Sequence, residues 1–296
     1  MAAVATWPAR LPAAPLREGY SGDPHQAATR TEMEQGTARK RHLTAAPPAQ
    51  ISLKWRMSAE QFEIFKSFYH FDLREGTGWF NVPLWFGSGM VTVEAQFSER
   101  YQAAARGAAS VTVTTALTVR ELPTMSEEEA ATLAELGPTG MLRWPDLLPD
   151  TMLRDTVNID PHQPVLKTDM DNGPVSKRAP FPNSPASTPV SWRMSGSEFE
   201  AFKGFYRWLL KNGNAWFSMP IWVGGGFEIV AVQFTDRYAF TPGRALDVLV
   251  TADLTLRQLP VLEDGPALLL TSLGEDGLAS FAAGIHQFVH VTYPEV

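Results

Sequence analysis

Histidine is the side chain of this sequence that could transfer a proton or bind a metal ion near neutral pH. Six histidines are spread along the 296 residues, and the chain contains no cysteine. His286 and His290 have the spacing of two metal ligands on one face of a helix, but the segment around them, HQFVHVTYPEV, is typical of a strand. The sequence therefore does not predict a helical metal pair.

Two further histidines stand in a motif that occurs twice. The sequence Asp-Pro-His-Gln is found at 23–26 and again at 160–163. His25 and His162 could act as general bases in a pair of hydrolytic sites, and such an enzyme would lose turnover when they are replaced by alanine. A polar turn with proline as its second residue is the simpler explanation of the motif.

The motifs of common catalytic and cofactor sites do not occur in the sequence. It has no HExxH zinc motif, no GxSxG nucleophile elbow and no P-loop. The glycine-rich segments at 87–89 and 224–226 are not followed by a helical pattern, so they do not form a phosphate cradle. We therefore expect no enzymatic activity, no cofactor and no metal ion.

Two tryptophans could make contacts with a ligand or a partner. Trp85 and Trp222 each lie two residues after a proline and two residues before a glycine-rich tip. An exposed tryptophan in this position could stack on a sugar ring or dock against a protein. The alternative is a tryptophan folded back over the edge of the sheet.

Basic residues cluster at Arg39, Lys40 and Arg41, with a weaker counterpart at Lys177-Arg178. The net charge of −7 makes the chain a poor candidate for broad phosphate binding. A solvated arm or an acidic neighbouring subunit explains the cluster better than nucleic acid does. We expect no sequence-specific recognition of nucleic acid.

The elements that would position these residues occur twice, at a constant offset of 137 residues. Residues 23–123 align with residues 160–260 without a gap, and about four positions in ten are identical. A period of this length indicates that each copy is a whole domain. The matching segments are Trp55-Arg56-Met57-Ser58 with Trp192-Arg193-Met194-Ser195, Arg100-Tyr101 with Arg237-Tyr238, and Leu122-Pro123 with Leu259-Pro260.

Each copy has the pattern of a strand, one amphipathic helix and an antiparallel meander. Ser58 and Ser195 begin the helices, with capping-box partners three residues later, and phenylalanines then recur at helical spacing. These phenylalanines predict a core. The segments 102–109 and 239–246 are expected to be loops that differ between the copies.

The predicted fold class is mainly β (α+β), with two tandem copies of a small β-sandwich or open barrel and one packed amphipathic helix in each. The predicted divisions are an N-terminal arm at 1–14, a first repeat at 15–123, a linker with a short helix at 124–152, a second repeat at 153–260 and a C-terminal extension at 261–296. Ser126 with Glu129 caps the linker helix.

No apolar run reaches the 18 to 20 residues, roughly, that span a bilayer. The segment MAAVATWPARLPAAPL has two prolines and an arginine where a signal peptide needs an apolar core. We expect a soluble, non-secreted chain with a loose N-terminal arm and no membrane contact.

The string WRMSAEQFEIFKSFY…G…WFNVPLWFG…AQFSERY…LTVRELP resembles small proteins encoded in the tail modules of long-tailed (siphovirus-type) phages and prophages. The preceding EGY…TRTEMEQGTARKRH fits the same pattern, and the resemblance covers 15–123 and again 153–260. Its aromatic and proline motifs are less specific than a catalytic signature. The duplication departs from the single copy that is usual in these proteins.

The resemblance implies a virion structural protein, similar in role to the distal tail protein, whose ring-forming domain is a β-sandwich or barrel with a flanking helix. It implies a place at the tail tip, after folding in the host cytoplasm. The implied partners are further copies of this chain, the tail tube protein, the tape measure protein and baseplate hub proteins.

The duplication suggests a hypothesis about symmetry. A ring of three chains would present six similar domains to a sixfold tail tube and threefold differences to the tip below it. A homotrimer is the prediction, and a ring of six chains is the alternative. The competing function is a tandem carbohydrate-binding module for a host surface, with Trp85 and Trp222 as stacking platforms.

Overall fold

The computed structural model describes residues 4–24, 28–31, 39–42, 47–87, 89–106, 110–137, 140–153, 158–161, 166–168, 176–178, 185–223, 226–243 and 247–258. These residues belong to one compact unit, Met1–Leu259, and a second unit comprises Pro260–Val296. The predicted C-terminal extension at 261–296, with His286 and His290, lies outside the described residues. His25 and His162 lie outside them as well.

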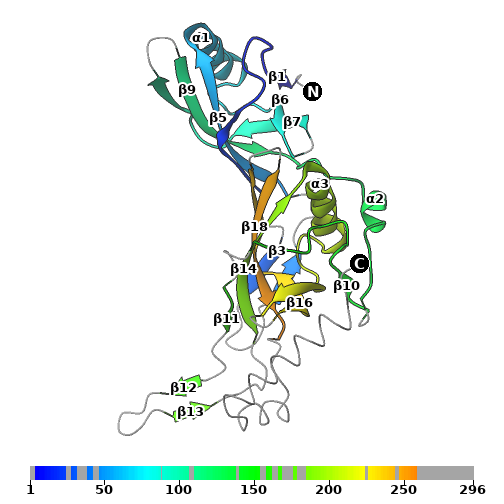
Figure 1. Ribbon diagram of the computed structural model, residues 1–296. Helices are drawn as coiled ribbons and strands as arrows, with labels where there is room; N and C mark the ends of the chain where they lie inside the picture. Colours follow the sequence, from blue (N-terminus) through cyan, green and yellow to red (C-terminus); the bar gives the residue numbers. More distant parts are fainter. Residues whose placement is uncertain are drawn as a thin grey trace, which may run out of the picture. The chain divides into compact units, whose positions relative to one another are not determined.

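The described chain contains the same series of elements twice (Figure 1). The first copy contains β1 (Ala5–Thr6), β2 (Leu16–Pro24), β5 (Ala49–Ser58), α1 (Ala59–Ser67), β6 (Phe80–Trp85), β7 (Met90–Phe97), β8 (Gln102–Arg106) and β9 (Ser110–Val119). The second copy contains β10 (Leu142–Arg143), β11 (Asp160–Pro161), β14 (Ala186–Met194), α3 (Gly196–Gly204), β15 (Phe217–Trp222), β16 (Phe227–Phe234), β17 (Ala239–Pro242) and β18 (Val248–Leu256). Between the copies lies α2 (Glu127–Ala131).

Fourteen strands of the two copies are joined in one hydrogen-bonded sheet. Its main path is β1-β6-β7-β9-β5-β2 in the first copy, followed by β17-β18-β16-β15-β10 in the second. The longest ladders are antiparallel, and Trp55 pairs with Val113 in β5–β9 as Trp192 pairs with Val250 in β14–β18. The prediction of a mainly β fold with few helices is confirmed.

Two small hairpins lie outside the large sheet. The first joins β3 (Ala28–Thr31) to β4 (Arg39–His42), and the second joins β12 (Leu166–Thr168) to β13 (Ser176–Arg178). The two hairpins have the same register, because Thr29 pairs with Arg41 in the first and the residues 137 positions later, Leu166 and Arg178, pair in the second. The basic cluster at 39–41 therefore lies on a strand.

Each helix begins where the sequence predicts. Ser58 and Ser195 form capping boxes with Gln61 and Glu198: each serine hydroxyl accepts a hydrogen bond from the backbone amide three residues later, and each serine amide donates one to the side-chain oxygen of that residue. Each helix then continues into a π-helical turn, η1 (Phe68–Asp72) or η3 (Phe205–Leu209). The linker helix has the predicted capping box between Ser126 and Glu129.

The phenylalanines at helical spacing lie mainly in the core. Phe65, Phe199 and Phe202 have no exposed surface, and Phe62 is half-buried. Phe65 and Phe202 sit edge-on to Tyr101 and Tyr238, with ring centroids 4.9 and 5.0 Å apart. Aromatic pairs of this kind add stability beyond the area that they bury.

The repeats extend further toward the N-terminus than the sequence analysis placed them. Trp7 is 6% exposed and stacks on Trp55 at 4.6 Å, so residues 4–12 are not the loose arm that was expected. Trp144, in the segment expected to be linker, is 1% exposed and stacks on Trp192 at 5.1 Å. Strands β1 and β10 run parallel to β6 and β15 beside these tryptophans.

The predicted loops at 102–109 and 239–246 are a second correction, because both contain a strand. β8 pairs with β9, and β17 pairs with β18. The outer edges of these two strands differ: β17 also pairs with β2 of the first copy, through Phe240 and Gly22, whereas β8 has no second partner within the described residues.

Three buried tyrosines predict a loss of stability in alkali. Burial raises the pKa of Tyr20, Tyr206 and Tyr238 above the usual 10.0. In the unfolded chain these phenols ionise near that value, so above it the folded state binds more protons than the unfolded state. The free energy of unfolding therefore falls as the pH rises above 10, and full stability is present below it.

An ultraviolet titration of tyrosinate absorbance, with circular dichroism followed in parallel, tests this expectation. Part of the absorbance change of the six tyrosines should coincide with unfolding. A single reversible ionisation of all six near the ordinary pKa, with the fold intact, would contradict it.

Candidate subunit interface

The structure places Trp85 and Trp222 differently. Trp85 is half-buried; its ring meets Tyr20 edge-on at 6.5 Å, and the Tyr20 hydroxyl donates a hydrogen bond to its carbonyl. Trp222 is 39% exposed and pairs with Phe227, which is 44% exposed. The two copies therefore do not present equal tryptophan platforms.

The basic cluster touches the second copy through Lys40. The Lys40 ammonium donates a hydrogen bond to the carbonyl of Phe234, at the end of β16. Arg41 is exposed, and for Arg39 the structure describes the backbone alone. One member of the cluster thus lies at the contact between the copies.

The first part of this contact is a strand pairing. Gly22 of β2 is paired with Phe240 of β17, and the Phe240 ring fills the space beside it, since a Cβ at Gly22 would lie 2.0 Å from the ring. The next residue, Asp23, forms an ion pair with Arg237 at 2.8 Å. We call this pairing of β2 with β17, together with its ion pair, the strand joint.

The second part is the packing of residues 121–131, which include α2, against α3 and η3. We call this packing the linker cover. Trp208 donates a hydrogen bond to the carbonyl of Met125 at 3.0 Å, and Arg207 bonds Thr124 at 3.0 Å and Glu121 at 2.5 Å. A Cβ at Gly204 would lie 2.4 Å from the Met125 side chain, so a larger residue here would have to displace that side chain. Figure 1 shows α2 beside α3, and Ala130 of α2 is fully buried.

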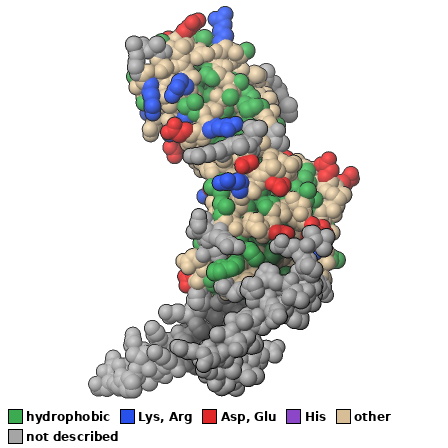
Figure 2. Space-filling model, in the orientation of Figure 1, with side chains coloured by type: hydrophobic (Ala, Val, Ile, Leu, Met, Phe, Trp, Pro, Cys, Tyr) green, Lys and Arg blue, Asp and Glu red, His purple; other side chains and the backbone are tan. Residues whose placement is uncertain are grey.

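The same positions are open in the first copy. The counterpart of Trp208 is Phe71, which is 74% exposed, and the counterpart of Arg207 is the exposed His70. The counterparts of Phe240 and Arg237 are Ala103 and Arg100, both exposed. In the view of Figure 2, Lys and Arg side chains lie over the first copy around apolar areas. The first copy thus presents, uncovered, the surface that the second copy has covered.

Lys203 is the side chain most changed by this cover. Its ammonium is buried, donates hydrogen bonds to the Pro123 carbonyl at 2.6 Å and Glu200 at 2.8 Å, and lies 5.2 Å from the Phe199 ring centre. Burial lowers the pKa of Lys203, and Glu200 opposes the shift. Its counterpart Lys66 forms the same pair with Glu63 in a side chain that is 42% exposed.

Replacing Lys203 with methionine is expected to lower the free energy of unfolding by about 1–3 kcal/mol, because the half-buried Pro123 carbonyl and Glu200 lose their hydrogen bonds to the buried ammonium. Lys66→Met is the matched control, and it should cost less than about 0.5 kcal/mol because its ion pair is exposed. Urea denaturation of both variants measures the difference. Equal effects would show that the linker does not cover Lys203.

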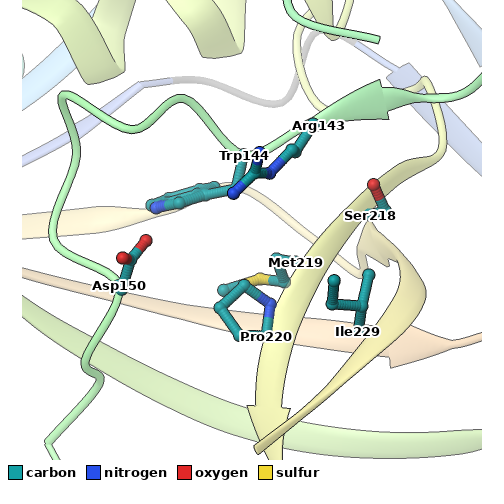
Figure 3. A pocket seen from close by; sticks show the side chains of 7 residues that line it. All are labelled: Arg143, Trp144, Asp150, Ser218, Met219, Pro220 and Ile229. Atoms are coloured by element: carbon teal, nitrogen blue, oxygen red, sulfur yellow. The ribbon is translucent and has the colours of Figure 1, made fainter. Parts of the chain in front are cut away.

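A small pocket lies beside the second tryptophan stack (Figure 3). It has a volume of about 110 Å³ and is lined by Arg143, Trp144, Asp150, Ser218, Met219, Pro220 and Ile229. The outer face of the β15–β16 hairpin continues from it as exposed apolar surface at Ile229, Trp222 and Phe227. Arg143, Asp150 and Ser218 supply the polar part of the lining, and the other four residues supply its apolar part.

Sequence reasoning missed both parts of the contact between the copies. The constant offset of 137 could have found Trp7 and Trp144, because Trp-Pro and Leu-Pro recur at 7–8 with 144–145 and at 11–12 with 148–149. It gave no signal for the pairing of β2 with β17.

Across the described part of the chain, no three His, Asp or Glu side chains gather as a metal site, and none of the helices is long and apolar enough to cross a bilayer.

Comparisons with known proteins add little to this geometry. No protein-family model matches the chain, and no curated protein matches it. Among solved structures, a chain from the virion of a native gene transfer agent particle is similar at 13% identity, with a TM-score of 0.30, over 42% of this chain and 99% of that chain. A likeness at this TM-score carries no argument about fold or function.

Proposed function

We propose that the protein is a structural subunit of a phage-type virion, and that it forms a ring at the distal end of a tail. The ring would join the tail tube protein to baseplate and tip proteins, and three chains would supply its six similar copies. The sequence resemblance supports the place in the tail. The observation that supports ring formation is that the linker and β2 of the first copy cover a surface of the second copy, while the equivalent surface of the first copy is exposed.

Surfaces of this kind are typical of subunits that associate head to tail. A heterologous contact repeats until it closes as a ring or continues as a filament. The second copy already makes such a contact inside one chain, through Gly22 with Phe240 and Asp23 with Arg237. The chain therefore has the form of a connector, and its described residues contain no arrangement that favours a reaction.

Deletion of the encoding gene in cells that produce the particles tests the role. We expect particles without tails, or tubes without a tip, in negative-stain images, and recovery when the gene is supplied from a plasmid. Tails of normal form and normal infectivity in the deletion strain would contradict the proposal. Six chains per tail, counted in a reconstructed particle, would contradict the three-chain stoichiometry.

A carbohydrate-binding module is the second candidate, and the exposure of Trp222 is the observation that favours it. A glycan array on the purified protein, with Trp222→Ala as the matched variant, separates the two functions. Binding that is lost in the variant, with unchanged circular dichroism, would favour the module. Trp85 is half-buried beside Tyr20, so we expect no binding through the first copy.

A further inference from the structure

We propose that the free edge of β8 in one chain binds residues 158–160 of a second copy of this chain, in the register of the strand joint. This inference deepens the proposed function, since it names the surfaces by which the ring would form. The accepting strand β8 and the accepting strand β17 occupy equivalent positions in the two copies. The donating segments, around Gly22 and around Ile159, are equivalent as well.

Both surfaces of the proposed contact are available within the described part of the chain. β8 pairs with β9 along one edge, and all five of its residues are exposed. β11 pairs with β14 in the register that joins β2 to β5, since Asp160 pairs with Ser187 as Asp23 pairs with Gln50. The other edge of β11, which corresponds to the edge of β2 that meets β17, has no described partner.

The residue sizes at the two contacts are complementary. In the strand joint the donor is the smallest residue, Gly22, and the acceptor is the large Phe240. In the proposed contact the donor is the larger Ile159, which is half-buried, and the acceptor is the small, exposed Ala103. The size difference is reversed between donor and acceptor, so both pairs can fill a similar space.

The two charges of the strand joint recur at the equivalent positions of the proposed contact. Asp23 and Arg237 form the ion pair of the strand joint, and their counterparts Asp160 and Arg100 have the same charges and are exposed. A partly desolvated pair of this kind fixes register and partner choice more than it adds affinity. A second copy of the chain thus carries the donor segment with the charge that the β8 side requires.

The linker cover is not repeated as it stands. Ser67 occupies the position of Gly204, where a Cβ would meet the Met125 side chain. The proposed contact is therefore confined to the β8 edge and Arg100. Phe71 lies outside the pairing.

Cysteine pairs test the register, because the natural chain has no cysteine. Ala103→Cys with Ile159→Cys should give disulfide-linked oligomers on a non-reducing gel after mild oxidation, ending at three chains if the ring closes. Gly22→Cys with Phe240→Cys is the matched control within one chain, and it should give a linked monomer. Ala104→Cys with Ile159→Cys is the negative control, because neighbouring residues of a strand point to opposite faces.

The proposal is overturned if the Ala103 and Ile159 pair gives no more linked oligomer than the Ala104 and Ile159 pair. Charge reversal supplies a second test in the Ala103→Cys, Ile159→Cys background. Arg100→Glu alone and Asp160→Arg alone should each lower the oligomer yield by about threefold to tenfold. Both substitutions in one chain should restore the yield, because every contact then joins opposite charges; no restoration counts against the register.

These tests separate the contact from the function. Linked oligomers of the purified protein, together with normal tails in the deletion strain, would leave the contact standing and remove the virion role. Defective tails, together with no specific linkage, would support the virion role and contradict the proposed contact at β8.

Discussion

Replacing Trp144 with alanine is expected to lower the free energy of unfolding by about 3–5 kcal/mol. The indole is 1% exposed, stacks on Trp192 at 5.1 Å and meets Phe205 edge-on at 5.8 Å. Its Nε1 also donates a hydrogen bond to the Pro149 carbonyl at 3.3 Å. The surrounding rings cannot collapse into the space without leaving their own contacts, so a cavity remains.

The control for this prediction is Trp222→Ala, whose side chain is 39% exposed and which should cost no more than about 1 kcal/mol. Trp7→Ala should resemble Trp144→Ala, because Trp7 stacks on Trp55 and donates to the Pro12 carbonyl in the same way. Guanidinium denaturation followed by circular dichroism measures all three. Similar losses for Trp144→Ala and Trp222→Ala would contradict the buried stack.

Gly22→Ile is expected to destabilise the strand joint, and Phe240→Ala in the same chain is expected to relieve part of the loss. A Cβ at Gly22 would lie 2.0 Å from the Phe240 ring, so isoleucine alone overpacks the joint by about 1–3 kcal/mol. Phe240→Ala alone should cost about 3–5 kcal/mol, because the ring is 1% exposed and lies 5.1 Å from Phe199.

The double variant should cost less than the sum of the two single variants by at least about 1 kcal/mol, because isoleucine fills the space that phenylalanine leaves. It reproduces in the strand joint the residue types of the Ile159 and Ala103 pair. Denaturant titration of the four proteins of this double-mutant cycle gives the coupling. Additive losses would mean that the two positions do not share one space, and the proposed contact at β8 would lose its size argument.

The local parts of the fold could be predicted from the sequence. The capping boxes at Ser58, Ser126 and Ser195 depend on residues three positions apart, and the structure contains all three. The hairpin β6–β7 lies where the alternation of apolar and polar residues and the glycines at its tip predict it. Pro83 pairs with Thr92 in this hairpin, on a part of β6 that does not pair with β1. Proline is tolerated there because no neighbouring strand needs its amide.

The non-local parts could not be predicted, for reasons visible in single residues. β8 has the sequence QAAAR, which lacks the β-branched and aromatic residues of ordinary strands, so it was expected to be a loop. Lys66 and Lys203 have the same type, spacing and acidic partner, yet one is exposed and the other is buried. The difference comes from the linker segment that covers Lys203. The sequences of the two helices contain no signal for this packing, because the covering residues lie outside them.

The paired tryptophan stacks also have a consequence for how the chain folds. Trp7 and Trp144 insert beside equivalent strands, β6 and β15, with the same parallel pairing. During synthesis the segment around Trp7 is made before the strands that carry Trp55 and Trp192. Trp7 could therefore stack on Trp192 of the second copy in place of Trp55 of the first. Tandem domains of similar sequence are prone to such misassembly. The strands around Trp55 are made earlier in translation than those around Trp192, so we expect Trp7 to pack in the first copy before the second is complete.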